Sequence, residues 1–230
     1  VLFKSIKKIH LTIVNLLIIS GFAIGEPIGG VIESTGVTSL VRESERLESD
    51  VGTDVNIYDE AETANGRMLI EFLDEEKLSL TENSLVYIDE AYYDPDPSKS
   101  KMAISMVRGT ARFASGAGNR IKKQNVDVST PTANITMRGT DFTTTIDELG
   151  RTMVVLLPDE ETGASSGEIV VYNDGGEVVL TEAYSATVVS SYDTPPTQSV
   201  IIQGITPNLI DNMFIVNPPS EIREQIEEDY

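Results

Sequence analysis

The stretch MRGTDFTTTID, residues 137–147, contains an Arg-Gly-Thr tripeptide within a run that otherwise alternates like a β-strand. The stretch MVRGTARFASG, residues 106–116, carries the same tripeptide ahead of a phenylalanine. Glycine inside a strand pattern is typical of a bulge, a kink or the close approach of another backbone. The repeat therefore predicts two equivalent corners in successive layers of a β structure.

The arginines of the two tripeptides have a second interpretation. Bases are scarce in this chain, so Arg108 and Arg138 are candidates for an anion-binding pair. An arginine at a strand corner more often pairs with a carboxylate of its own chain, and this chain is rich in carboxylates. We favour this structural interpretation, in which Phe142, two residues past Thr140 on the same alternating face, points into the core.

Short apolar runs rich in β-branched residues continue on both sides of this stretch, and turn residues interrupt them about every 8 to 12 residues. Residues 29–43 predict a hairpin around Ser34-Thr35-Gly36, and residues 168–191 predict another around Asn173-Asp174-Gly175-Gly176. No stretch before residue 200 sustains helical spacing. The pattern predicts a mainly β fold, a single β-sandwich or β-roll-like domain of many short strands.

The chain divides into three segments. Residues 1–25 carry Lys4, Lys7 and Lys8 near the start and continue into the apolar run LTIVNLLIISGFAI. This is the layout of a secretory signal, and the run is short for a membrane span. Cleavage is expected before Glu26, with export to the periplasm or the exterior of a bacterial cell. We expect residues 26–190 to form the β domain, and residues 191–230 to form a proline-containing linker and a short, partly helical tail.

The charge of the chain narrows the choice of partners. There are 37 acidic and 17 basic residues, for a net charge of −20, so we expect no nucleic-acid partner and no stable membrane insertion after signal cleavage. Turns rich in carboxylates are weak candidates for a calcium site, and their alternative is an ordinary solvated turn. The candidate ligands are Asp94 and Asp96 in one turn, and Asp159 and Glu160 in another.

We do not expect an enzyme. His10 is the only histidine, it lies in the predicted signal, and cysteine is absent, so Ser-His-Asp and Cys-His catalysis and the usual zinc sites are excluded from the mature chain. The sequence contains no phosphate-binding glycine loop, and no cofactor is expected. Carboxylate chemistry, as in a glycan hydrolase, and a Ser-Lys pair stay open, but close pairs of acids arise by chance in a chain with 37 of them, so their presence carries little information.

Several motifs together resemble the FecR domain. They are a leading glycine-marked stretch, an Asn-Gly-Arg stretch before a Phe-x-Asp turn, and a closing Thr-Pro-x-Ala…Arg-Gly-Thr-x-Phe signature, which is the specific part. The resemblance covers about residues 29–147 and implies a mostly β domain outside the cytoplasm. In the iron-citrate regulators that name the family, this domain relays a signal from an outer-membrane receptor to a sigma factor. The residues that match the family motifs, with an implied structural role, are Gly66, Arg67, Asp74, Arg108, Gly109, Thr110, Thr130, Pro131, Arg138, Gly139, Thr140 and Phe142.

Two functions follow from these observations. Ten residues precede the apolar run, whereas the regulators carry a cytoplasmic anti-sigma segment there. We therefore expect a freestanding, exported FecR-domain protein that binds a protein or glycan of the cell envelope without catalysis. The alternative is the periplasmic sensor part of a transmembrane sigma-factor regulator whose N-terminus is missing from this sequence.

Overall fold

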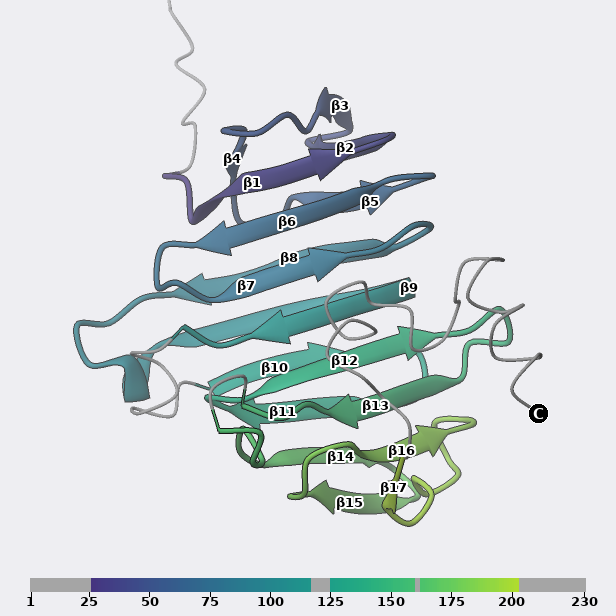
Figure 1. The fold of residues 1–230 in the computed structure, drawn as a ribbon. Coiled ribbons are helices and arrows are strands. Elements are labelled where there is room, and N and C mark those ends of the chain that lie inside the picture. The colour runs from purple at the N-terminus through teal and green to yellow at the C-terminus, as the bar shows by residue number, and fades with distance from the viewer. Residues whose placement is uncertain (1–25, 117–124, 160–161, 203–230) are drawn as a thin grey trace, which may run out of the picture.

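The computed structural model describes residues 26–116, 125–159 and 162–202 of the chain. Within these ranges the regular secondary structure is almost entirely β-strand, with a single turn of 3-10 helix, η1 (Pro97–Lys99). The mainly β fold class is therefore confirmed. The strands stack into two layers that face each other along the whole length of the body (Figure 1).

One layer, called sheet A here, has the strand order β4 (Asp54–Val55), β1 (Gly29–Thr35), β6 (Arg67–Phe72), β7 (Lys77–Leu80), the second half of β9 (Lys101–Ala114), β12 (Asp141–Ile146), β13 (Thr152–Leu156), β16 (Ser185–Val189) and β17 (Val200–Ile201). The other layer, sheet B, has the order β3 (Glu45–Glu48), β2 (Thr38–Arg42), β5 (Glu60–Thr63), β8 (Leu85–Tyr92), the first half of β9, β10 (Asn125–Ser129), β11 (Asn134–Arg138), β14 (Ile169–Asn173) and β15 (Gly176–Leu180). Of the strands in the described part of the chain, only β9 belongs to both sheets.

The core lies between the two sheets and follows from the alternation of the strands. In β6, for example, Met68, Ile70 and Phe72 are buried while the residues between them are half-exposed. At the centre of the body, Phe113 of β9 and Phe142 of β12 are cross-strand partners whose rings stack with centroids 4.9 Å apart. Both rings are almost fully buried. Each ring follows one of the two tripeptides, so the stacked pair anchors both strands in the core.

The first tripeptide lies where β9 passes from sheet B to sheet A. Arg108 still pairs with β8 in sheet B, and Gly109 already pairs with β12 in sheet A. Gly109 has φ +90°, a conformation that side chains with a Cβ resist. A Cβ on Gly109 would also lie 2.5 Å from Ser84 Cα, so the corner needs glycine for two independent reasons.

The second tripeptide makes the same crossing between two separate strands. Strand β11 of sheet B ends at Arg138, and β12 of sheet A begins at Asp141. Gly139 between them has φ +57°, and the hydroxyl of Thr140 contacts the Ser166 hydroxyl at 2.7 Å. Both tripeptides thus lead the chain from sheet B into sheet A.

A row of hydroxyl groups lines the edge of the body at which β9 turns. The Ser84 Oγ donates to the Thr110 carbonyl oxygen at 3.1 Å and accepts the Thr110 amide at 3.1 Å. The Ser84 amide donates to the Thr63 hydroxyl, and the Thr110 hydroxyl contacts that of Thr145 at 2.9 Å. Backbone groups that leave the ladder at the corners are thereby satisfied inside the protein.

One predicted hairpin is wrong and the other is confirmed. The runs on either side of Gly36 form β1 and β2, but β1 pairs with β6 in sheet A and β2 pairs with β5 in sheet B. Gly36 has φ +71°, and a Cβ there would lie 2.7 Å from Gly66 Cα, so the chain crosses between the sheets where a hairpin was expected. The hairpin before and after Gly175 is present as β14 and β15.

Strand pairing continues beyond residue 190, where the sequence predicted the domain to end. Strand β17 pairs with β16, and the Thr187 hydroxyl donates to the Thr197 carbonyl oxygen at 2.7 Å. The predicted signal segment 1–25 and the predicted tail helix both lie outside the described residues. Among the described residues no helix is long and apolar enough to cross a membrane.

Candidate functional site

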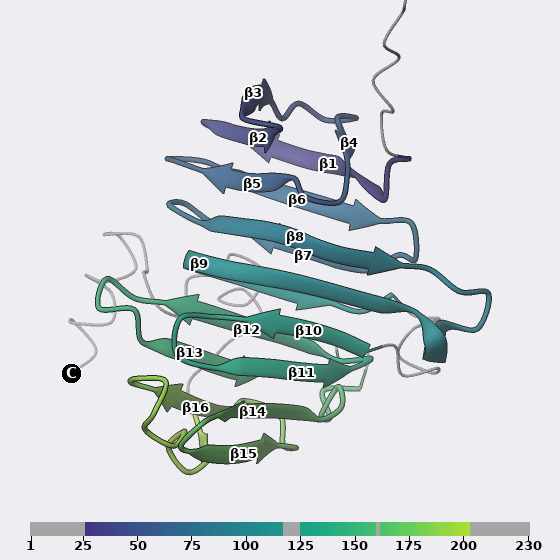
Figure 2. The same cartoon turned by 180° about the vertical axis from the view of Figure 1, so that it is seen from behind.

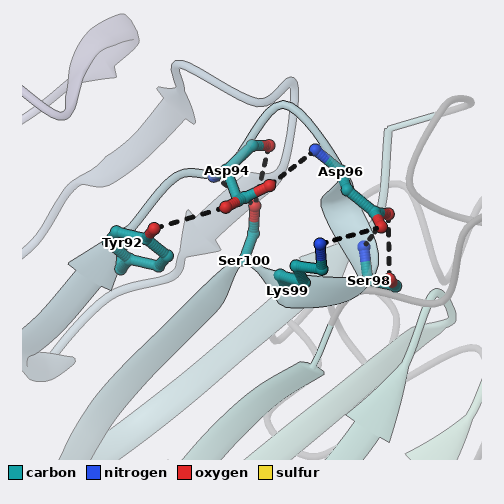
Figure 3. A network of polar contacts seen from close by, with 6 residues as sticks. All are labelled: Tyr92, Asp94, Asp96, Ser98, Lys99 and Ser100. Atoms are coloured by element: carbon teal, nitrogen blue, oxygen red, sulfur yellow. Dashed lines mark hydrogen bonds and ion pairs between the residues drawn. The ribbon is translucent and has the colours of Figure 1, made fainter.

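The calcium candidates Asp94 and Asp96 lie in the loop between β8 and β9 (Figure 3). Asp94 Oδ1 accepts the Asp96 amide at 2.8 Å, and Asp94 Oδ2 accepts the Tyr92 hydroxyl at 3.3 Å. Asp96 Oδ1 accepts the amide and the hydroxyl of Ser98, and its Oδ2 lies 3.8 Å from the Lys99 ammonium. These contacts are the Asx-turn bonds that shape a short loop.

In the second calcium candidate, the Asp159 carboxylate is likewise hydrogen-bonded within its own turn. Asp159 Oδ1 accepts the amide of Thr162 at 2.9 Å and its hydroxyl at 3.0 Å. Glu160 lies outside the described residues. Among the residues that the structure describes, no group of three or more His, Cys, Asp or Glu side chains is placed to hold a metal ion. Calcium binding stays a prediction that rests on the sequence.

Arg108 has a partner inside the domain. Its Nη2 donates to Glu62 Oε1 of β5 at 2.8 Å, and Arg46 of β3 contacts the other oxygen of Glu62 at 2.7 Å. The Arg46 guanidinium, followed by that of Arg108, lowers the pKa of Glu62 from its ordinary value despite partial burial. The charge of Arg108 is therefore used in a three-residue network on the outer face of sheet B.

Arg138 has a different environment. Its side chain is exposed on the outer face of sheet B, and no carboxylate in the described part of the chain forms an ion pair with it. Across the sheet it pairs with Asn125 of β10, which in turn pairs with Lys101 of β9. Arg108 lies seven residues along β9 from Lys101, which is about 23 Å for a strand. The structure therefore places Arg138 beside Lys101 and far from Arg108.

The other family-motif residues lie at turns and strand starts. Gly66 packs against the Gly36 corner, with a Cβ position 2.8 Å from the Val37 amide, and Arg67 begins β6. Asp74 lies in the turn between β6 and β7, where its Oδ1 accepts the Glu76 amide at 3.3 Å. None of these contacts involves a group positioned for chemistry on a substrate.

Thr130 and Pro131 form the turn that joins β10 to β11. The Thr130 hydroxyl donates to the Ala133 carbonyl oxygen at 2.9 Å and accepts the Ala133 amide at 3.0 Å. Thr152 of sheet A donates its hydroxyl to the same Thr130 oxygen at 2.8 Å. This turn is therefore tied to the opposite sheet by side-chain hydrogen bonds.

Two ion pairs with buried carboxylates were not predicted. Arg42 binds Asp59 through Nε and Nη2, both at 2.7 Å, and the Asp59 carboxylate is fully buried. Arg112 binds Asp141 in the same two-pronged manner, at 3.1 and 2.7 Å, and Asp141 is also fully buried. Paired, hydrogen-bonded charges of this type fix the relative placement of strands and leave no free carboxylate for catalysis at either position.

Comparison with known proteins finds one family match. Residues 59–158, from the start of β5 to the residues after β13, match the model of the family described as FecR protein. The match includes both Arg-Gly-Thr corners. This part of the chain therefore matches the FecR domain.

The solved structures similar to this chain include two crystal structures titled "putative anti-sigma factor from Parabacteroides distasonis ATCC 8503". Their sequence identities are 14% and 15%, with TM-scores of 0.45 and 0.44. In both cases the similarity covers 60% of this chain and 57% of the other. The search of curated proteins found no match.

Proposed function

We propose that this chain is an exported, non-enzymatic FecR-domain protein that acts as a binding module of the cell envelope or exterior. The FecR match over residues 59–158 carries the proposal, because it supports a domain of the sensor or regulator type. The polar side chains of this segment that match the family motifs support the same view, since their described contacts are turn bonds, corner bonds and internal ion pairs.

The envelope location is supported by the lysine-rich start and the apolar run of the first 25 residues. The test is N-terminal sequencing of the protein recovered from its native bacterium. Recovery in the periplasmic or culture fraction with a first residue near Glu26 supports export. Recovery of the full-length chain in the cytoplasm or the membrane would overturn this part of the proposal.

Partner binding is tested by capture from envelope extract. The immobilised chain is compared with a Phe113→Ala, Phe142→Ala double variant, which keeps the charge and length of the chain but removes the stacked pair of the core. A partner identified by mass spectrometry that requires the folded chain supports a binding module. Equal capture by both chains, or no capture after cross-linking in cells, contradicts it.

A second function, the periplasmic sensor part of a transmembrane sigma-factor regulator, is favoured by the same FecR match. The genomic reading frame upstream of Val1 distinguishes the two. An in-frame stop codon supports the freestanding protein, and an open frame that encodes a helical cytoplasmic domain supports the regulator.

A further inference from the structure

Two basic side chains differ from all others that the structure describes. Lys101 and Arg138 have no ion pair with a described carboxylate, whereas each of the remaining described Lys and Arg side chains has an ion pair or another side-chain interaction. The chain carries 37 acidic residues and a net charge of −20, so internal partners are abundant. Lys101 and Arg138 have no ion pair with a described carboxylate although carboxylates are abundant, and this exception calls for an explanation.

The two bases lie in one cross-strand row on the outer face of sheet B. Tyr92 of β8 pairs with Lys101 of β9, Lys101 pairs with Asn125 of β10, and Asn125 pairs with Arg138 of β11. We call these four residues the basic row. Strands are about 4.8 Å apart, so the Lys101 and Arg138 backbones are separated by about 10 Å. Figure 2 shows the strand ends that carry the row, where β8 ends, β9 and β10 begin and β11 ends.

The side chains of the basic row face away from the core. The strand neighbours Met102, Val126 and Met137 are buried between the sheets, so the alternating residues lie on the outer face. Lys101, Arg138 and Tyr92 are exposed, and Tyr92 retains 53% of its accessible surface. The row therefore presents an ammonium, an amide and a guanidinium as hydrogen-bond donors, while the Tyr92 hydroxyl donates to Asp94.

Acidic side chains near the basic row limit the positively charged surface to this end of sheet B. Asp127 lies two residues along β10 on the same face and accepts the Thr136 hydroxyl at 2.7 Å. Asp94 accepts the Tyr92 hydroxyl at 3.3 Å, at the other end of the row. A long polyanion would meet these carboxylates and the general negative charge of the protein. A short anionic group that contacts only the row avoids both.

Backbone pairing excludes one mode of recognition. At the row, β9 and β10 each have a hydrogen-bonded neighbour on both sides, and β11 pairs with β10 at Arg138 and with β14 as far as Met137, so an incoming peptide cannot add itself to the sheet as a further strand between them. Recognition at this place has to use the side chains. A guanidinium and an ammonium on an open face are suited to separate carboxylates.

We propose that the basic row docks a short acidic segment of a partner protein, which crosses the strands of sheet B and places one carboxylate on Arg138 and another on Lys101. In an extended segment, acidic residues two positions apart are about 7 Å apart, a separation that the long side chains of Arg138 and Lys101 can span. Asn125 donates its amide between the two charges. The proposal rests on the proposed function, because it assigns the chemistry of the partner that a binding module would recognise.

The test uses the exported chain and a rhodamine-labelled octapeptide of alternating glutamate and threonine, followed by fluorescence anisotropy. The counterpart peptide has glutamine in place of glutamate. We expect Arg138→Gln and Lys101→Gln each to weaken binding of the acidic peptide by roughly fivefold, and the double variant by more than about tenfold. Arg151→Gln is the matched control, since it removes an exposed charge that is paired with Asp147 at the turn between β12 and β13.

The proposal is overturned if the acidic peptide binds no better than its glutamine counterpart, or if the double variant binds it as well as the wild type does. It is also overturned if 10 mM sulfate at constant ionic strength displaces the peptide completely, because the row would then be an unspecific anion site. Melting curves check that the variants are folded, which the exposure of Lys101 and Arg138 predicts. If the wild type and the Lys101→Gln, Arg138→Gln double variant capture the same envelope partner, the proposed binding module is retained and only the docking site is refuted.

Discussion

The substitution Gly109→Ala tests the role of the first tripeptide most directly. Gly109 has φ +90°, and an added Cβ would lie 2.5 Å from Ser84 Cα and 2.7 Å from Ser84 Cβ. Real Cβ atoms do not approach a backbone this closely, so either the corner or the β7–β8 turn has to move. Such a shift would also disturb the two hydrogen bonds between the Ser84 hydroxyl and the backbone of Thr110.

The destabilisation expected for Gly109→Ala has two parts, conformational strain and steric clash, and a second glycine of the same chain separates them. Gly52 has φ +91°, nearly the same conformation, and nothing lies within 4 Å of its Cβ position. Gly52→Ala therefore measures the conformational strain alone, which we expect to cost about 1 kcal/mol. Gly109→Ala adds the clash, at about 1–3 kcal/mol for forced overpacking, so its total should be about 2–4 kcal/mol.

Urea denaturation of the wild type and both variants gives the two free-energy differences. The double variant with Ser84→Gly and Gly109→Ala should show a favourable coupling, because Ser84→Gly removes the Oγ and Cβ atoms from the clash. If Gly109→Ala cost no more than Gly52→Ala, the corner would not depend on the contact with Ser84. The interpretation of the tripeptide as a tightly packed crossing would then be wrong.

Three further predictions concern the core and the ion pairs. Phe142→Ala removes one ring of the stack with Phe113 and should cost about 3–5 kcal/mol in urea denaturation, and a loss below about 1.5 kcal/mol would mean that the site collapses around the gap. Asp59→Ala removes the buried partner of Arg42 and should cost about 3–5 kcal/mol, whereas an unchanged midpoint would show that the pair is dispensable. The pKa of Glu62 is lowered in the folded state, so its stabilisation is present above the unfolded pKa of about 4.3 and is lost as the pH falls through the lower folded value. Glu62→Gln should therefore destabilise more at pH 7 than at pH 3, and equal effects at both pH values would contradict this assignment.

Local patterns predicted the strands and one of the two hairpins. Alternation marked β6 and β12, and the Asn173–Gly176 turn marked the β14–β15 hairpin, because each signal depends on neighbouring residues alone. The Gly36 turn has the same local appearance, yet it joins different sheets. What decides this is the contact with Gly66, thirty residues away, which no local pattern contains.

The ion pairs show the same limit more strongly. Arg42 and Asp59 are 17 residues apart and Arg112 and Asp141 are 29 apart, and their pairing depends on the order of strands in the two sheets. The sequence shows only that acids are abundant, so it cannot select the few that are buried and paired. Which residues of distant strands come to lie side by side depends on the register of the strands, and therefore on the whole fold.

The two copies of the Arg-Gly-Thr tripeptide have the same backbone role but different surroundings. Gly109 and Gly139 both lead the chain from sheet B to sheet A, so the backbone has the same task at each position. The arginines before them lie toward opposite ends of the strands of sheet B, however, and of these two arginines Glu62 pairs with Arg108 and not with Arg138. Arg138 faces solvent beside Lys101 instead. A purely structural role explains both glycines and the paired Arg108. It does not explain why Arg138 has no ion pair with a described carboxylate, and for this reason we propose the second corner as the place of partner binding.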